Sequence, residues 1–91
     1  SYFEEALKLS EEIQNKRAQA HWTNALANVN VRLGKNAQAI AYYEKALETF
    51  RAAKENREIA QLLASLAKQY SYLGQNDKAL EYSQEALSVL D

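Results

Sequence analysis

Apolar residues recur along this chain at spacings of three and four positions, the period of a helix with one buried face. After Asn15 they form a single stripe: Trp22, Ala25, Leu26, Val29 and Leu33. The pattern predicts a helix that begins at Asn15, an N-cap residue, and ends at Gly34. We expect Trp22 to pack in the core of the protein, because leucine occupies the corresponding place, Leu62, in the later copy of this pattern; exposure on the surface of the binding groove is the alternative.

The same spacing predicts four further helices. The first covers residues 2–14 and carries Phe3, Ala6, Leu7 and Ile13 on its apolar side, and the others begin at Asn36, Asn56 and Asn76. The connections between these predicted helices are only a few residues long, so consecutive helices should lie antiparallel.

Glycines mark two of the helix ends. Gly34 and Gly74 are expected in the left-handed conformation, which other residues adopt at a cost of about 1 kcal/mol. The boundary near Lys54 has neither glycine nor proline, so only Asn56 as a cap and the spacing of the pattern place it.

The chain repeats itself at a fixed interval. The stretch 33–40, Leu-Gly-Lys-Asn-Ala-Gln-Ala-Ile, returns at 73–80 as Leu-Gly-Gln-Asn-Asp-Lys-Ala-Leu. Positions 2–7 stand in the same phase as positions 42–47. A fixed period of this kind indicates stacked helical repeats.

On these positions the chain resembles the tetratricopeptide repeat family. The first copy of the family's core pattern is Leu26, Ala27, Leu33, Gly34, Ala39, Tyr43, Ala46 and Leu47, and the second is Leu66, Ala67, Tyr70, Leu73, Gly74, Ala79, Ala86 and Leu87. The period, roughly 40 residues, exceeds the family's usual length of about 34 residues, and the closing proline is missing. Lengthened repeats of this kind are similar to those of kinesin light chains and of bacterial peptide-binding regulators.

The resemblance implies an all-α fold, a right-handed solenoid of α-hairpins with five antiparallel helices in one domain. Residues 1–15 would be the second helix of a partial repeat, residues 16–55 repeat one and residues 56–91 repeat two. The implied function is a non-catalytic scaffold that binds a peptide segment of a partner protein in a concave groove.

Composition and charge narrow the range of partners, locations and cofactors that we expect. A net charge of −1 without long blocks of one sign argues against nucleic acid as a partner. No run approaches the roughly 20 apolar residues of a membrane span, and without a targeting signal we expect a cytoplasmic protein. There is no cysteine, which excludes disulfides and thiolate metal sites, and we expect no cofactor. The missing methionine and the start within a repeat suggest a segment of a longer protein.

The sequence offers little for catalysis. It has a single histidine, His21, no cysteine and no glycine-rich phosphate loop, so no nucleophile–base pair is evident. The acidic pairs at 4–5 and 11–12 point about 100° apart on a helix, which is typical of solvated surface. We expect no enzymatic activity.

The resemblance places the binding groove on the first helix of each hairpin. The candidate peptide-binding residues are His21, Asn24, Asn28, Arg32, Gln61, Lys68 and Tyr72. Asparagine is a poor helix former, so Asn24 and Asn28 in mid-helix suggest hydrogen bonding to a peptide backbone. Solvated polar surface is the alternative, and both interpretations stay open.

Arg32 and Lys68 make the expected groove mildly basic, which favours an acidic segment or a free carboxylate. Ordinary solubilising charge explains them equally well. The set of residues with which chaperone-tail receptors of this family hold a terminal carboxylate matches only at Asn28.

A second function class is a structural or assembly segment. The first and last helices carry apolar faces without a polar capping helix, so the chain could self-associate through them.

Overall fold

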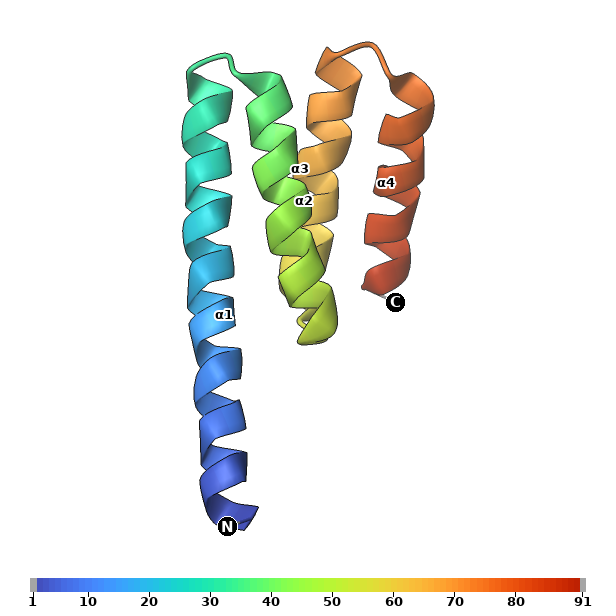
Figure 1. Ribbon diagram of the computed structural model, residues 1–91. Coiled ribbons are helices and arrows are strands. Elements are labelled where there is room, and N and C mark those ends of the chain that lie inside the picture. Colours follow the sequence, from blue (N-terminus) through green and yellow to red (C-terminus); the bar gives the residue numbers. More distant parts are fainter. Residues whose placement is uncertain (1, 91) are drawn as a thin grey trace.

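The computed structural model describes residues 2–90, with the exception of the side chains of Tyr2, Phe3 and Ser10. The predicted place of Phe3 in the first stripe therefore lies outside the described residues. Four helices make up this part of the chain: α1 (Tyr2–Arg32), α2 (Asn36–Ala52), α3 (Asn56–Tyr72) and α4 (Asn76–Val89) (Figure 1). The all-α class is confirmed.

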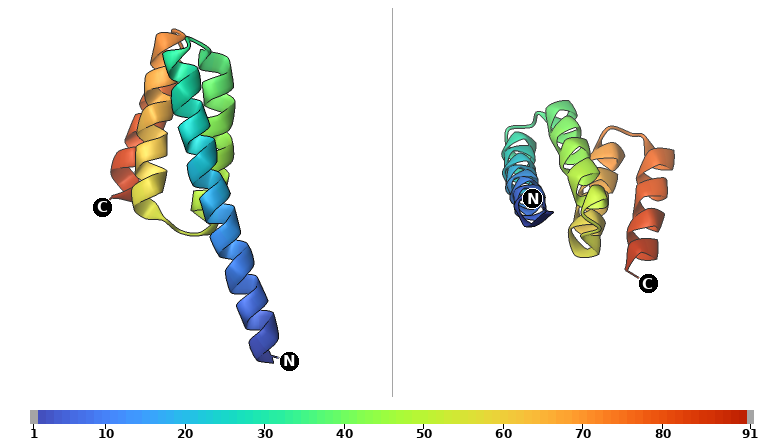
Figure 2. Two further views of the ribbon diagram at one scale, coloured as in Figure 1. Left: turned by 90° about the vertical axis from the view of Figure 1, so that its left-hand side faces the viewer. Right: turned by 60° about the horizontal axis from the view of Figure 1, so that its bottom comes forward.

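Consecutive helices run antiparallel and pack side by side, α1 on α2, α2 on α3 and α3 on α4 (Figure 1). The views in Figure 2 show the helices as a zigzag of hairpins rather than a closed bundle. This is the expected helical-hairpin solenoid. Within the described part of the chain, one side of α1 and one side of α4 carry no neighbouring helix.

Three turns of the same kind connect the helices. Gly34 and Gly74 have φ angles of 76° and 79°, as the sequence predicts, and Lys54 adopts the same conformation with φ 56°. The next residue in each turn donates its amide to a carbonyl five positions back: Lys35 to Asn30 (2.8 Å), Glu55 to Phe50 (3.0 Å) and Gln75 to Tyr70 (2.9 Å). These bonds satisfy carbonyl groups left free at each helix end.

The expected helix boundary at Asn15 is absent, because α1 continues through it as one helix of 31 residues. The segment around Asn15, Glu-Glu-Ile-Gln-Asn-Lys-Arg-Ala, contains mostly good helix formers and no glycine or proline. Residues 2–14 therefore extend beyond the other helices instead of folding back on α1 (Figure 2). Asn56 begins α3 as expected, but the cap position is Glu55 and it makes no side-chain cap hydrogen bond.

The core lies along α2 and α3. Its largest fully buried side chains are Phe50, Leu62, Leu63 and Leu66. Ala39 and Ala46 of the repeated pattern are 0% and 1% exposed, and their small side chains allow neighbouring helices to pack closely at these positions.

The predicted stripe of α1 is not part of this core. Trp22 is 73% exposed, and Leu26, Val29 and Leu33 are also exposed. α1 instead buries Ala20 and Ala27. The prediction for Trp22 was wrong because it rested on the equivalent Leu62, which lies on a helix with neighbours on both sides, whereas α1 packs only on α2 within the described residues.

Polar contacts join helices that are distant in sequence. Tyr82 of α4 donates from its hydroxyl to Glu44 Oε1 of α2 at 2.7 Å, and its ring stacks on Tyr70 of α3 with centroids 5.4 Å apart. Arg51 of α2 pairs with Glu85 of α4 at 2.7 Å. These contacts tie α4 to the middle of the protein.

Candidate protein-binding site

A hollow of about 280 Å³ lies where residues of α1 and α3 meet buried Tyr43 of α2. We call it the α1–α3 hollow. The residues that line it are Asn28, Val31 and Arg32 of α1, Tyr43 of α2, and Ser65, Lys68 and Gln69 of α3. Three of the seven candidate binding residues, Asn28, Arg32 and Lys68, are thus brought to one place.

The charged residues that line the α1–α3 hollow are all basic. Arg32 and Lys68 are exposed at its edge, and none of the described residues that line it is acidic. A guanidinium and an ammonium group offer several donors and no acceptor, so they favour a carboxylate.

Asn28 is already engaged with the protein on one side. Tyr43 donates from its hydroxyl to Asn28 Oδ1 at 2.5 Å, so the amide oxygen serves the fold. Burial raises the pKa of Tyr43, and a hydrogen bond with Ser65 offsets part of that rise. The Asn28 residue is exposed, and its NH2 group can donate to a ligand.

Gln69 is a lining residue that the sequence analysis missed. It is 2% exposed, and its Oε1 is buried without a hydrogen-bond partner among the described residues. Leaving a buried amide oxygen unpaired costs about 1–3 kcal/mol. The signal in the sequence was a glutamine three positions after Leu66, within the apolar stripe of α3.

The remaining candidate residues lie outside this hollow. Tyr72 is adjacent to it, since Lys68 Nζ lies 6.0 Å from the centre of the Tyr72 ring. His21 packs edge-on against Phe50, with ring centroids 5.0 Å apart, while Asn24 is half-buried and Gln61 is exposed. The structure does not gather these residues into one groove.

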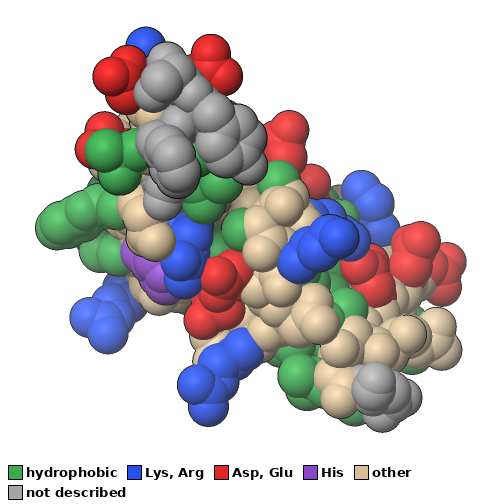
Figure 3. All heavy atoms as spheres, turned by 90° about the horizontal axis from the view of Figure 1, so that it is seen from below, with side chains coloured by type: hydrophobic (Ala, Val, Ile, Leu, Met, Phe, Trp, Pro, Cys, Tyr) green, Lys and Arg blue, Asp and Glu red, His purple; other side chains and the backbone are tan. Residues whose placement is uncertain are grey.

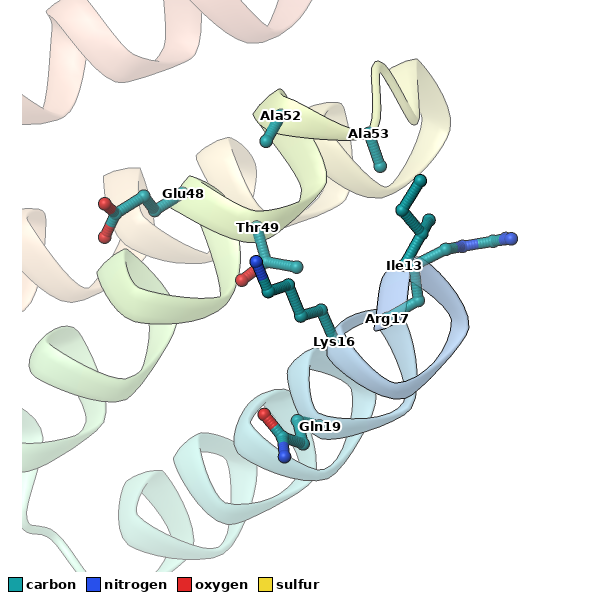
Figure 4. A pocket seen from close by; sticks show the side chains of 8 residues that line it. All are labelled: Ile13, Lys16, Arg17, Gln19, Glu48, Thr49, Ala52 and Ala53. Carbon is teal, nitrogen blue, oxygen red and sulfur yellow. The ribbon is translucent and has the colours of Figure 1, made fainter. Parts of the chain in front are cut away.

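A second hollow, of about 460 Å³, lies between the middle of α1 and the end of α2. Figure 4 shows Lys16 and Ile13 of α1 pointing toward Thr49 and Ala53 of α2, and the charged side chains of Arg17 and Glu48 at opposite sides of the hollow. Charges of both signs line it, so it does not select a charged ligand as clearly as the α1–α3 hollow does. The face in Figure 3 likewise mixes acidic and basic side chains, with His21 (purple) at the surface.

Metal ligands and membrane spans are both missing from the part of the chain that the structure describes. Among the described residues, no group of three or more His, Cys, Asp or Glu side chains could hold a metal ion. Over residues 2–90, none of the helices combines the length and apolar character needed to cross a membrane.

The helical hairpins and their fixed period agree with a known family of repeat proteins. A family model described as tetratricopeptide repeat matches residues 1–52 and 17–91, which together span the chain. The chain belongs to the tetratricopeptide repeat family. Tetratricopeptide repeats generally mediate protein–protein interactions and are typically non-enzymatic. Searches of curated proteins and of solved structures found no significant match.

Proposed function

We propose that this tetratricopeptide repeat chain is a non-catalytic module that binds a peptide segment of a partner protein. The α1–α3 hollow receives a carboxylate of that segment. Arg32 and Lys68 neutralise its charge, and Asn28 donates a hydrogen bond to it. His21, Asn24, Gln61 and Tyr72 stay predicted contacts for the rest of the peptide, and a cytoplasmic location stays a prediction.

The unpaired Oε1 of Gln69 is the observation that carries this proposal. Buried polar atoms in proteins almost always have a hydrogen-bond partner, so an orphaned acceptor beside a hollow indicates a missing donor. A peptide N–H supplies such a donor. A carboxylate near Arg32 and Lys68 together with an N–H near Gln69 is a pattern that a peptide, rather than a free inorganic anion, provides.

The hollow's size limits what it can hold. A volume of about 280 Å³ accommodates one acidic side chain or one chain terminus but not a longer segment. The remainder of the peptide would then lie along the exposed surface of α1 and α3, near Tyr72.

The proposal is tested with two short synthetic peptides. One has blocked ends and two adjacent glutamates, and the other is neutral with a free C-terminal carboxylate. Two-dimensional NMR of the labelled protein follows the side-chain amides of Asn28 and Gln69 during titration. We expect both amides to shift with at least one peptide, and the peptide that binds more tightly identifies the source of the carboxylate.

A double variant, Arg32→Gln with Lys68→Gln, removes the charge of the hollow. We expect its affinity to fall about tenfold or more, because each lost charge-assisted contact weakens binding. The control, Lys45→Gln with Arg57→Gln, removes the same charge from exposed positions elsewhere. Equal affinity in both double variants, or amides that do not shift with either peptide, would contradict the proposal.

A second candidate function is self-association through the first and last helices. It is favoured by the exposed apolar side chains of α1 and α4, which include Trp22, Leu26, Leu80 and Leu87. Isolated exposed leucines are common on protein surfaces, but a continuous row on a helix marks an interaction face.

A further inference from the structure

The exposed faces of α1 and α4 correspond to faces that are buried against each other inside the chain. Positions separated by one repeat period, as the two turn glycines are, occupy equivalent places. Trp22, 73% exposed, is equivalent to Leu62, which is 2% exposed. Leu87, 71% exposed, is equivalent to Leu47, which is 5% exposed. The difference arises because α2 and α3 pack on each other, whereas α1 and α4 each lack one neighbour among the described residues.

We propose that copies of this chain associate head to tail, with the α3–α4 hairpin of one copy packed against α1 of the next. This inference deepens the second candidate function by naming the two faces and their register. The contact repeats between copies the junction of α2 with α3, which the chain already forms once. Trp22, Leu26 and Val29 form the α1 face, and Leu80, Leu87 and Leu90 belong to the α4 face.

The α4 face is shaped to receive a helix. A hollow of about 670 Å³ lies between α3 and α4, and its lining includes Ala64, Ala67, Ala79, Leu80, Ala86 and Leu87. The equivalents of Ala79 and Ala86 in the first repeat, Ala39 and Ala46, are fully buried. Small side chains at these positions allow a helix to approach closely, and in the chain α3 takes that place beside α2.

A different arrangement of two copies would cover the α1 face but not the α4 face. Residues 2–14 of one copy could cover α1 of another and the reverse, since they stand in the phase of α2. That exchange would bury Leu7 and Trp22 but leave Leu80, Leu87 and Leu90 in water. Head-to-tail contact covers both apolar faces, and because it does not close on itself it extends with concentration.

The test uses one variant for each face. Trp22→Glu damages the α1 face and leaves the α4 face intact, while Leu87→Glu does the opposite. Both positions are exposed, so we expect both variants to fold, and circular dichroism verifies it. Sedimentation equilibrium should show the original chain growing beyond a dimer with concentration, each variant alone staying monomeric, and their equimolar mixture stopping at a mass of two chains.

Fluorescence gives an independent readout, because Trp22 is the only tryptophan. In the mixture only the Leu87→Glu chain fluoresces through tryptophan, and its Trp22 should become shielded from a soluble quencher when the Trp22→Glu chain is added. Leu9→Glu, a change at an exposed α1 position outside both faces, should associate like the original chain.

Three results would overturn the head-to-tail contact. A strict monomer at all concentrations would also overturn self-association as a function. Dimers formed by Leu87→Glu alone, or variants that do not complement each other, would overturn this register and leave self-association standing. Lys68 lines both the α3–α4 hollow and the α1–α3 hollow, so peptide binding is measured separately, by the amide shifts of Asn28 and Gln69 in dilute protein.

Discussion

Residues 16–32 of α1 and residues 56–72, which form α3, lie one repeat period apart and share apolar residues at several equivalent positions, but their surroundings differ. Leu66 of α3 is completely buried, whereas its equivalent Leu26 is 48% exposed. α3 is covered on both sides, by α2 and by α4, and α1 packs only on α2 within the described residues. The comparison teaches that apolar periodicity predicts which side of a helix can be buried, while a neighbouring helix decides whether it is.

One pair of equivalent positions, 70 and 30, makes different contacts in the two helices. Tyr70 of α3 stacks on the ring of Tyr82 in α4. The equivalent residue in α1, Asn30, donates to the carbonyl of Leu26 in its own helix at 2.9 Å. At this pair of positions the α3 side chain contacts a neighbouring helix and the α1 side chain bonds to its own helix. Other side chains join α1 to the rest of the fold, since Asn28 accepts a hydrogen bond from Tyr43 and Arg17 pairs with Glu55 at 2.9 Å.

The largest expected difference between the two helices is in the stability cost of truncating the equivalent residues Leu66 and Leu26. Leu66→Ala leaves a cavity in the core, and we expect it to lower the free energy of unfolding by about 2–5 kcal/mol. Leu26→Ala at an exposed position should cost less than about 1 kcal/mol. Urea unfolding of dilute samples, followed by circular dichroism, measures both. Equal costs would show that the α1 stripe is covered after all.

Substituting the glycine in the turn that follows each of these two helices should lower stability by the same amount, although the helices differ in burial. Gly34 and Gly74 both have positive φ, and a Cβ at either position would meet nothing within 4 Å among the described residues. Alanine should therefore cost about 1–2 kcal/mol at each position, from backbone strain alone. Lys54 bears this strain already at φ 56°, so Lys54→Gly should stabilise the protein by up to about 1 kcal/mol. Thermal unfolding of the three variants measures these changes in stability. A destabilised Lys54→Gly protein would show that the positive φ of Lys54 carries no backbone strain.

The smallest expected effect concerns the hydrogen bond from Tyr82 of α4 to Glu44 of α2. Burial, and next the hydrogen bond to Glu44, raise the pKa of Tyr82 above its ordinary value of 10.0. The unfolded chain releases this proton first. The stability that Tyr82 contributes is therefore complete below about pH 10 and is lost as the pH rises from there through the pKa of the folded protein.

Tyr82→Phe should lower stability by about 1 kcal/mol at neutral pH and make the decline above pH 10 shallower. Tyr72→Phe, at an exposed tyrosine, is the control and should change neither. Urea midpoints measured from pH 7 to 11 test this. A decline as steep in Tyr82→Phe as in the original chain would assign the pH dependence to other groups.

Much of the fold could be predicted from the sequence, because local physics determines it. Gly34 and Gly74 mark helix ends through their backbone freedom, and Ala39 and Ala46, which belong to the repeated pattern, are buried. The turn at Lys54 was harder to place, since lysine gives no local signal. Its position halfway between the two glycines could have revealed it.

The continuity of α1 and the burial of Gln69 in the hollow could not be predicted. Residues 13–15 and 53–55 are equivalent and both lack glycine, yet the first are helical and the second form a turn. Without glycine, either conformation is accessible, and tertiary contacts decide between them. Gln69 was missed for a related reason, because only packing shows that a polar side chain in an apolar stripe is buried without a partner.

Quenching of Trp22 fluorescence in a dilute solution of the unmodified chain tests the central claim most directly. If no part of the chain covers the α1 stripe, Trp22 will be quenched by acrylamide nearly as readily as a free tryptophan derivative, and raising the protein concentration will protect it. A Trp22 that is shielded at every dilution, in a chain with full helix content, would contradict the account.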